Sequence, residues 1–163
     1  MIKEKLGSHN PEKEIIPIRP APIISNLEVV AFDKEMDVQL SEPRATIYEP
    51  DPAVLRAGLV RFLGAQLGAF QLDPDIAYLT ADQRVNTPFA RAWAVEAWFP
   101  FNLKRLRAYL RERSVGQVVV KKRGSPLQPE TLIRDLRLTG YQERVIILTH
   151  LRGRHIVVVC TPR

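Results

Sequence analysis

The chain has 163 residues, 45% of them hydrophobic and 26% charged, which fits one or two small globular domains and excludes collagen-like, fibrous and disulfide-scaffold proteins. The single cysteine, Cys160, cannot form an internal disulfide and fits a cytoplasmic location, and no apolar run reaches the roughly 18 residues of a membrane span. A net charge of +6 makes a polyanion the first class of partner to consider.

Residues 1–26 are predicted to form an extended, proline-rich arm. Their charged and aliphatic residues follow neither the period of a strand nor that of a helix, and prolines interrupt them repeatedly. We therefore place the first folded module after residue 26. The prolines of the arm are Pro11, Pro17, Pro20 and Pro22.

Residues 27–100 are predicted to form an α+β module. Asp51 suits the N-cap of a helix and Pro52 its first turn, where the missing N–H costs nothing. Apolar residues at helical spacing extend this helix to about Phe70. Strands are predicted at Leu27–Phe32, Met36–Leu40, Arg44–Tyr48, Ile76–Thr80 and Arg91–Phe99.

Residues 101–163 are predicted to fold in the order helix, strand, helix, strand, strand. The first helix begins at the N-cap Asn102 and buries a stripe of leucines. The second begins at Pro129 and ends before Gly140, the expected C-cap. Strands are predicted at Gln117–Lys121, Arg144–His150 and His155–Cys160.

The last two strands form a hairpin whose register follows from its turn. A two-residue turn at Arg152 and Gly153 places His150 opposite His155. Both faces of the hairpin are then apolar, so we expect helices to cover one face and the acidic half of the chain, or a neighbouring protein, to cover the other. The opposed apolar pairs are Leu148 with Val157 and Ile147 with Val158.

Charge divides the chain sharply. Residues 1–100 hold 10 Lys and Arg against 14 Asp and Glu, a net charge of −4. Residues 101–163 hold 14 against 4, a net charge of +10. Such a basic segment favours nucleic acid as a partner, and the alternative is a basic surface that docks on an acidic protein domain.

Three groups of cations are candidate phosphate contacts: one on the first basic helix, one in the loop after the next strand, and one at the hairpin tip. Backbone N–H groups around Gly124 could complete an anion-binding nest in that loop. The structural alternative for each group is a solvated helix face or turn. Trp93, Trp98 and Tyr109 could stack on RNA bases, although core packing explains the tryptophans better. The candidate nucleic-acid-binding residues are Lys104, Arg105, Arg107, Arg111, Lys121, Lys122, Arg123, Arg152 and Arg154.

The sequence predicts no catalytic, metal or cofactor site. No glycine-rich phosphate loop, nucleophile elbow or zinc-protease motif is present. His150 and His155 could share an ion, but two ligands do not close a zinc site and Cys160 points to the opposite sheet face. Asp73 and Asp75 flank a proline and are interpreted as turn and capping residues.

Several ordered segments resemble a bacterial family of class I S-adenosylmethionine-dependent methyltransferases. Together they span about Arg44 to Cys160. The upstream segments are similar to the family's C-terminal part, and the downstream ones to its terminal THUMP-like domain. The segments are YEPDPAVLRAGL at 48–59, LDPDIAYLT at 72–80, TPFA at 87–90, LKRLRAYL at 103–110, VVVKKRG at 118–124 and LT at 148–149.

The resemblance implies a ferredoxin-like α+β module at residues 27–100 followed by a basic THUMP-like module at residues 101–163. It implies a noncatalytic module that binds a structured RNA, such as tRNA or rRNA, and positions it for a methyltransferase. Family members carry the catalytic domain upstream, so S-adenosylmethionine would bind there and no cofactor is expected in this chain. A protein-docking domain that packs on the methyltransferase domain is the alternative, and a homodimer is compatible with either.

Overall fold

The computed structural model describes residues 38–162, which form one seven-stranded sheet with four helices on its faces. The proline-rich arm and the strand predicted at 27–32 lie outside the described residues, as does the start of the one predicted at 36–40. The strand order is β2-β3-β1-β4-β7-β6-β5. All neighbours are antiparallel except β5 and β6, so the predicted α+β class is confirmed.

The elements before residue 101 form the N-terminal part of the sheet and its two short helices. Asp51 caps α1 as predicted, because its side chain accepts a hydrogen bond from the Ala53 N–H at 2.8 Å. A loop at residues 82–89 connects β3 to β4, where a complete ferredoxin-like β-α-β-β-α-β module has its second helix. The elements are β1 (Thr46–Pro50), α1 (Pro52–Arg56), α2 (Val60–Leu67), β2 (Phe70–Asp73), β3 (Ile76–Ala81) and β4 (Ala90–Pro100).

The single helix predicted from Pro52 to about Phe70 is wrong in extent. Gly58 and Gly68 both take positive φ angles, of 69° and 59°, which end α1 and α2 respectively. Phe70 then begins β2, a strand that was not predicted because the apolar residues up to Phe70 follow helical spacing. Pairing of β2 with β3 explains why the chain leaves the helix here.

The elements after residue 100 complete the sheet. β5 and β6 are parallel, and α4 makes the crossover between them, whereas β6 and β7 form the predicted hairpin. The helix predicted to end before Gly140 ends at Leu136, and Arg137 (φ 50°) is its left-handed C-cap. The elements are α3 (Leu103–Glu112), β5 (Val115–Lys122), α4 (Pro129–Leu136), β6 (Gln142–Leu151) and β7 (Arg154–Cys160).

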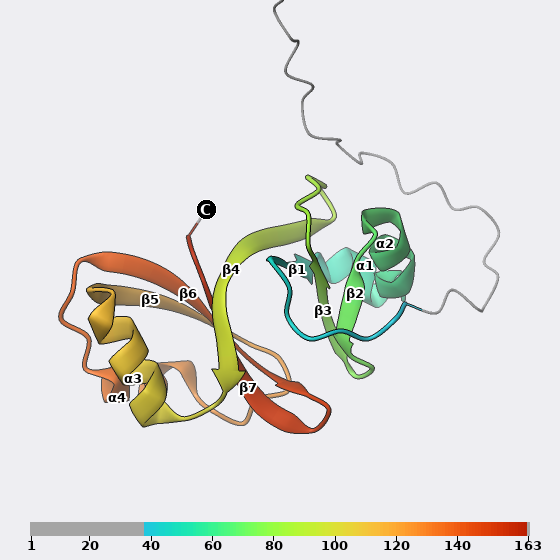
Figure 1. Ribbon diagram of the computed structural model, residues 1–163. Coiled ribbons are helices and arrows are strands. Elements are labelled where there is room, and N and C mark those ends of the chain that lie inside the picture. Colours follow the sequence, from blue (N-terminus) through green and yellow to red (C-terminus); the bar gives the residue numbers. More distant parts are fainter. Residues whose placement is uncertain (1–37, 163) are drawn as a thin grey trace, which may run out of the picture.

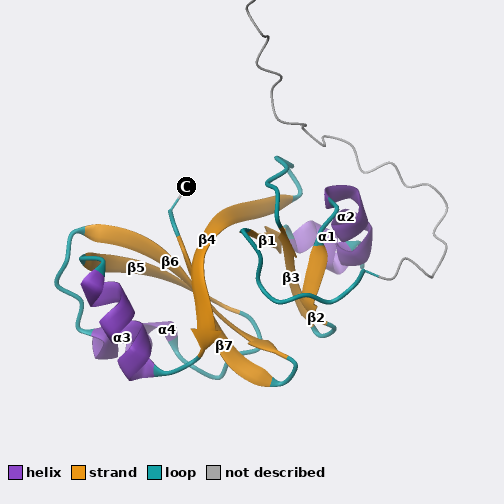
Figure 2. Ribbon diagram, in the orientation of Figure 1, coloured by secondary structure: helices purple, strands orange, loops and turns teal. Residues whose placement is uncertain are grey.

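β4 joins the two ends of the sheet. Its first part, Ala90 to Ala94, pairs with β1, and its second part, from Val95 to Pro100, pairs with β7. Figure 1 shows β4 curving between the two groups of strands, so that α1 and α2 lie at one side of the molecule and α3 and α4 at the other. Figure 2 shows the strands between these two helix pairs.

The register predicted for the hairpin is confirmed, including His150 opposite His155. Arg152 and Gly153 both have positive φ, as a type I′ turn requires. The structure also confirms the expectation that other elements pack on both apolar faces of the hairpin. α3 and α4 cover one face through a cluster that includes Leu106, Leu110, Leu132, Leu136, Ile146, Leu148, Val157 and Val159. Strands β1 to β3 cover the other through a cluster that includes Ile47, Leu72, Ile76, Tyr78, Ile147, Ile156, Val158 and Cys160.

Asp73 makes a polar link between the two ends of the sheet. One carboxylate oxygen accepts from the Asp75 N–H at 3.1 Å, which confirms the predicted turn role. The other lies 3.2 Å from Nδ1 of His150 and accepts from the backbone N–H of Arg152 at 3.0 Å. The turn of the β2–β3 hairpin thus holds the tip of the β6–β7 hairpin.

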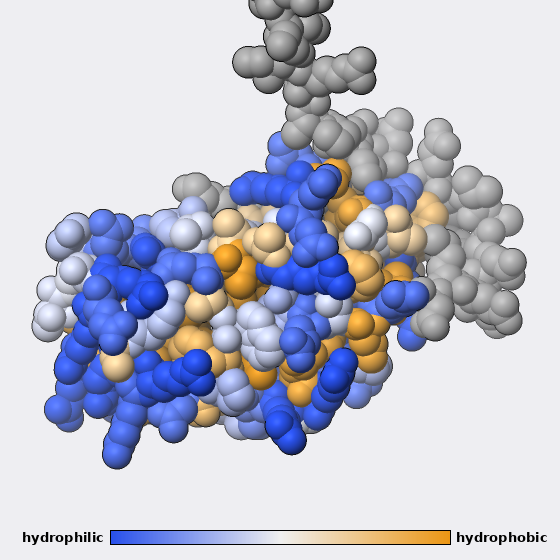
Figure 3. Space-filling model, in the orientation of Figure 1, coloured by the Kyte–Doolittle hydropathy of each residue, from blue (hydrophilic) through white to orange (hydrophobic). Residues whose placement is uncertain are grey.

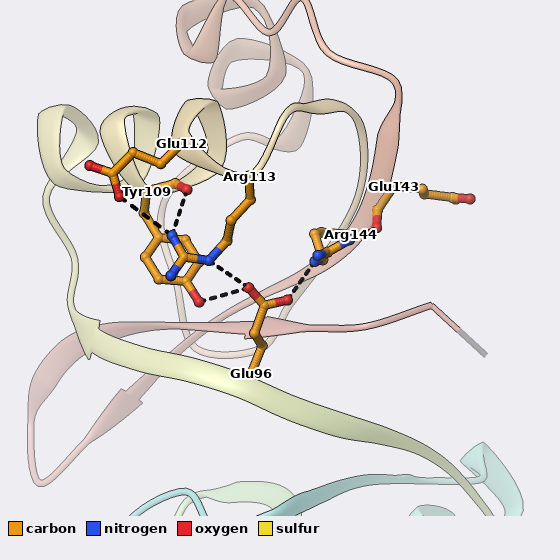
Figure 4. A network of polar contacts seen from close by, with 6 residues as sticks. All are labelled: Glu96, Tyr109, Glu112, Arg113, Glu143 and Arg144. Atoms are coloured by element: carbon orange, nitrogen blue, oxygen red, sulfur yellow. Dashed lines mark hydrogen bonds and ion pairs between the residues drawn. The ribbon is translucent and has the colours of Figure 1, made fainter.

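A second polar network surrounds Glu96 on β4 (Figure 4). Its carboxylate accepts hydrogen bonds from the Tyr109 hydroxyl at 2.8 Å and from Nε of Arg144 at 2.6 Å. Nε of Arg113 lies 2.9 Å from the same carboxylate, and its guanidinium stacks on the Tyr109 ring. β4, α3 and β6 are therefore joined through one carboxylate.

This network changes the ionisation of Glu96. Burial disfavours its charged form, but the hydrogen bonds from Tyr109 and Arg144 and the charges of Arg144 and Arg113 outweigh burial and lower its pKa below the usual value near 4.5. A lowered pKa stabilises the fold above the pKa of the unfolded chain, and this contribution is lost as the pH falls through the folded-state pKa.

We predict that Glu96→Gln lowers the free energy of unfolding by about 1–3 kcal/mol at neutral pH, because it removes the charge that three donors share. The difference between wild type and variant shrinks as the pH falls below about 4.5. Urea unfolding at a series of pH values measures both effects. Glu143→Gln, which changes an exposed carboxylate on β6 outside the network, serves as control and changes stability by less than about 0.5 kcal/mol.

Two glycines allow a close backbone contact at the start of β5. A Cβ atom on Gly116 would lie 1.8 Å from the carbonyl oxygen of Gly140, and one on Gly140 would lie 1.9 Å from that of Ser114. The segment from Gly140 onward is tied down by hydrogen bonds, since the Ser114 carbonyl accepts from the Tyr141 N–H at 2.8 Å and the Gln142 N–H at 2.9 Å. Gly140 is therefore needed for close packing rather than for a helix cap.

We predict that Gly116→Ala destabilises the protein by about 1–3 kcal/mol or more, because backbone atoms rather than a flexible side chain must move. Thermal unfolding measures the change. The neighbouring Gln117→Ala, at an exposed position of the same strand, is the control and stays within about 0.5 kcal/mol of wild type. Equal stability of Gly116→Ala and wild type would contradict the close contact.

Candidate nucleic-acid interface

The cations of α3 divide between two flanks of the helix. Arg107 donates to the backbone carbonyl of Asp135, and Arg111 donates to that of Arg137 at 3.5 Å, so both lie on the flank toward α4. Arg105 lies on the opposite flank, with its guanidinium 4.4 Å from the centre of the Phe99 ring of β4. Lys104 is exposed, and helical spacing places it with Arg107 and Arg111.

Strand alternation separates the cations at the end of β5. Lys121 points toward β1, where its ammonium lies 3.0 Å from Glu49, and Arg123 lies 4.0 Å from the same carboxylate. Lys122 points the other way and donates to Gln128, the N-cap residue of α4, at 3.3 Å. The three neighbours in sequence therefore do not form one cationic loop surface.

Glu49 reduces the charge that Lys121 and Arg123 could offer to a phosphate. Both side chains are only partly exposed, at 24% and 30%, and Lys121 also lies over the ring of Trp93. Their ion pairs connect β5 to β1, so they contribute to the contact between the two ends of the sheet. Both residues were predicted to bind nucleic acid, and both are engaged with a carboxylate of the fold.

The loop after β5 has the positive φ that the predicted nest needs, since Gly124 takes φ 70°. A Cβ atom at Gly124 would lie 2.6 Å from both the His150 ring and the Ile76 side chain, so the loop packs closely on β3 and β6. At the hairpin tip, the Arg152 and Arg154 side chains are exposed. The tip cations are thus accessible, while the backbone near Gly124 is held against other elements.

A pocket of about 430 Å³ lies where β1, β4 and β5 meet. Segments from three of the motifs that carry the family resemblance line it, although they are distant in sequence. Its cations face the carboxylates of Glu49 and Asp51, so it is polar but close to charge balance. The lining residues are Glu49, Pro50, Asp51, Pro52, Thr87, Pro88, Ala90, Arg91, Lys121 and Arg123.

Another group of cations lies on or beside the two C-terminal helices, at positions that we call the α3–α4 face. Sequence analysis missed two of them, Arg134 and Arg137, because they lie on a helix whose apolar stripe was its only marked feature. Figure 3 shows hydrophilic side chains over the part of the molecule that α3 and α4 occupy. The α3–α4 face comprises Lys104, Arg107, Arg111, Lys122, Arg134 and Arg137.

The aromatic residues considered for base stacking are engaged elsewhere. Trp93 is 6% exposed and belongs to the core, and Trp98 packs against the same cluster. The Tyr109 hydroxyl donates to Glu96, and Arg113 covers its ring. The core interpretation of the tryptophans is therefore confirmed.

His150, His155 and Cys160 lie where the register places them; His150 and Cys160 serve the fold, whereas the His155 side chain is exposed. Nδ1 of His150 is 3.2 Å from Asp73, and Cys160 is fully buried. Burial and the charge of Glu96 raise the pKa of the Cys160 thiol to about 12, so it is protonated at neutral pH and is a poor nucleophile. Among residues 38–162, no helix is long and apolar enough to cross a membrane.

Comparison with known families matches the C-terminal part of the chain. Residues 90–162 match the family described as "THUMP domain-like". The match begins at the first residue of β4 and includes both C-terminal helices and the hairpin. All the residues of the α3–α4 face lie inside it.

Comparison with whole proteins points to methyltransferases. The chain is 35% identical over 148 residues to an uncharacterized S-adenosylmethionine-dependent methyltransferase found in two strains of Mycobacterium tuberculosis, an alignment that covers 88% of this chain and 41% of each relative. A crystal structure described as a "putative methyltransferase" from Porphyromonas gingivalis W83 has a similar fold, with a TM-score of 0.64 and 23% identity over 77% of this chain and 31% of that one.

These comparisons confirm the resemblance found in the sequence. The chain spans about two fifths of the length of the curated relatives that it matches. Residues 90–162 are similar to the THUMP-like family, and the chain is similar to part of two uncharacterized S-adenosylmethionine-dependent methyltransferases.

Proposed function

We propose that this chain is an accessory module of an S-adenosylmethionine-dependent methyltransferase that binds a structured RNA, such as tRNA or rRNA, and positions it for methylation. The observation that carries the proposal is the exposed α3–α4 face of the THUMP-like domain. S-adenosylmethionine would bind to another part of the methyltransferase, because the sequence contains no glycine-rich cofactor loop.

Ion pairing within the fold favours the α3–α4 face over the cations that lie beside Glu96 and Glu49. Arg113 and Arg144 share Glu96, and Lys121 and Arg123 share Glu49. By contrast, Lys104, Arg111 and Lys122 are exposed, and their only hydrogen bonds within residues 38–162 go to neutral oxygens. Exposed cations without a carboxylate partner retain the field that attracts phosphates.

The alternative, a protein-docking domain, loses one of its two supports. It drew on a hairpin with two apolar faces, and elements of this chain cover both faces. The basic charge remains as its other support. Binding of the methyltransferase domain without binding of RNA would favour this alternative.

We predict that the triple variant Lys104→Ala, Arg111→Ala, Lys122→Ala weakens RNA binding and flattens its salt dependence. The slope of log affinity against log salt falls by roughly 0.7–0.9 for each phosphate that the variant no longer neutralises, and affinity falls about evenly across RNA sequences. Fluorescence anisotropy titrations with bulk tRNA and rRNA between about 50 and 200 mM salt measure both quantities.

The matched control replaces three exposed arginines outside the THUMP-like domain, Arg56, Arg61 and Arg84, with alanine. The control changes the net charge equally and leaves the slope almost unchanged. Equal reductions in affinity for the two triple variants would show that net charge alone governs binding. Absence of RNA binding by the wild-type chain at about 50 mM salt would overturn the proposed function.

A further inference from the structure

Tyr141 is a large aromatic residue that the fold does not bury. It is 83% exposed, far more than the other exposed apolar residues, of which Val119 at 46% is the next. Within residues 38–162, no hydrogen bond or ring contact engages its side chain. The exposed ring therefore contributes little to the stability of the core.

The backbone beneath this ring is held firmly. The Tyr141 N–H donates to the Ser114 carbonyl at 2.8 Å, and the Gly140 N–H donates to that of Val115 at 3.4 Å. Gly116 and Gly140 pack so closely that neither has room for a Cβ atom. A rigid backbone presents the ring at a defined place, which lowers the entropy cost of binding through it.

The ring borders a pocket with a cation in its wall. The pocket has a volume of about 520 Å³ and is lined by Arg111, Ser114, Val115, Thr139, Gly140 and Tyr141. Arg111 belongs to the α3–α4 face, so the pocket continues that face at the end of the sheet where β5 and β6 begin. It brings together an accessible aromatic ring, a guanidinium and small polar side chains.

These groups match the chemistry of one nucleotide. An aromatic ring stacks on a base, and a neighbouring arginine binds a phosphate. We propose that the Tyr141 pocket binds an unpaired nucleotide of RNA, with the Tyr141 ring stacked on the base and Arg111 in contact with an adjoining phosphate. This inference rests on the proposed RNA-binding function and adds a single-stranded element to the RNA that is bound.

An unpaired nucleotide fits the pocket better than a base pair. In a duplex, the faces of each base are covered by its neighbours, so a side chain can stack only where bases are unpaired or at a helix end. The cations of the α3–α4 face can contact phosphates of either kind of RNA. Tyr141 should therefore distinguish single strands from duplexes, whereas those cations should not.

The test compares Tyr141→Ala with wild type by anisotropy, using a uridine dodecamer as the single strand and a long RNA duplex without loops or overhangs, in which internal base pairs far outnumber the two ends. Loss of a base stack weakens binding of the dodecamer about tenfold, within the range of alanine substitutions at stacking residues, and leaves the duplex affinity unchanged. The salt slope stays as in wild type, because stacking releases no counterions. Tyr141→Phe keeps the ring and binds like wild type.

Val119→Ala, which removes apolar surface at another exposed position, is the control and leaves both affinities unchanged. If wild type and Tyr141→Ala bind the dodecamer equally, or if both RNAs weaken equally, the nucleotide pocket is overturned while RNA binding stands. If the wild-type chain binds neither RNA, the proposed function fails together with it. Thermal unfolding of Tyr141→Ala within about 1 °C of wild type shows that a weakened affinity does not reflect damage to the fold.

Discussion

Both faces of the β6–β7 hairpin are apolar and must be buried. The positions of the helices and of the N-terminal strands depend on this burial. Both strands are buried along most of their length, so neither face can be left to water without a large cost in free energy. α3 and α4 supply one layer locally, because they are the chain's neighbouring elements. The other layer comes from strands more than 60 residues earlier, and β4 makes this possible by pairing with both groups of strands.

This packing also decides which cations are free. Because the N-terminal strands cover one face of the hairpin, they bring Glu49 against Lys121 and Asp73 against His150 and the Arg152 backbone. On that side Lys121 and Arg123 therefore serve as internal partners of Glu49, whereas the Arg152 side chain stays exposed. Those on the far side lie on or beside helices that cover the opposite face, where no acidic strand reaches them. The fold thus leaves the cations of the α3–α4 face accessible, together with those of the hairpin tip.

Local signals predicted the C-terminal elements well, because local chemistry determines them. The Arg152–Gly153 turn sets the hairpin register, and Asn102 caps α3 with a hydrogen bond to the Arg105 N–H at 3.0 Å. Contacts distant in sequence were not predictable. β2 follows a segment with helical spacing, and its pairing with β3 makes it a strand. Lys121 forms an ion pair with Glu49, which lies 72 residues away in the sequence. Tyr141 was missed because a tyrosine after a glycine carries no signal until its exposure is known.

The charge distribution also limits how a polyanion can approach. Residues 38–100 hold seven acidic and five basic residues, so the end of the molecule that carries α1 and α2 offers a polyanion no net attraction. Attraction comes from the opposite end, and within a Debye length of roughly 8–10 Å only the cations nearest the ligand matter. A bound RNA would then run along the α3–α4 face and reach the Tyr141 pocket at the end of α3, because Arg111 belongs to both. The β1, β4 and β5 pocket, near charge balance, would remain outside that path.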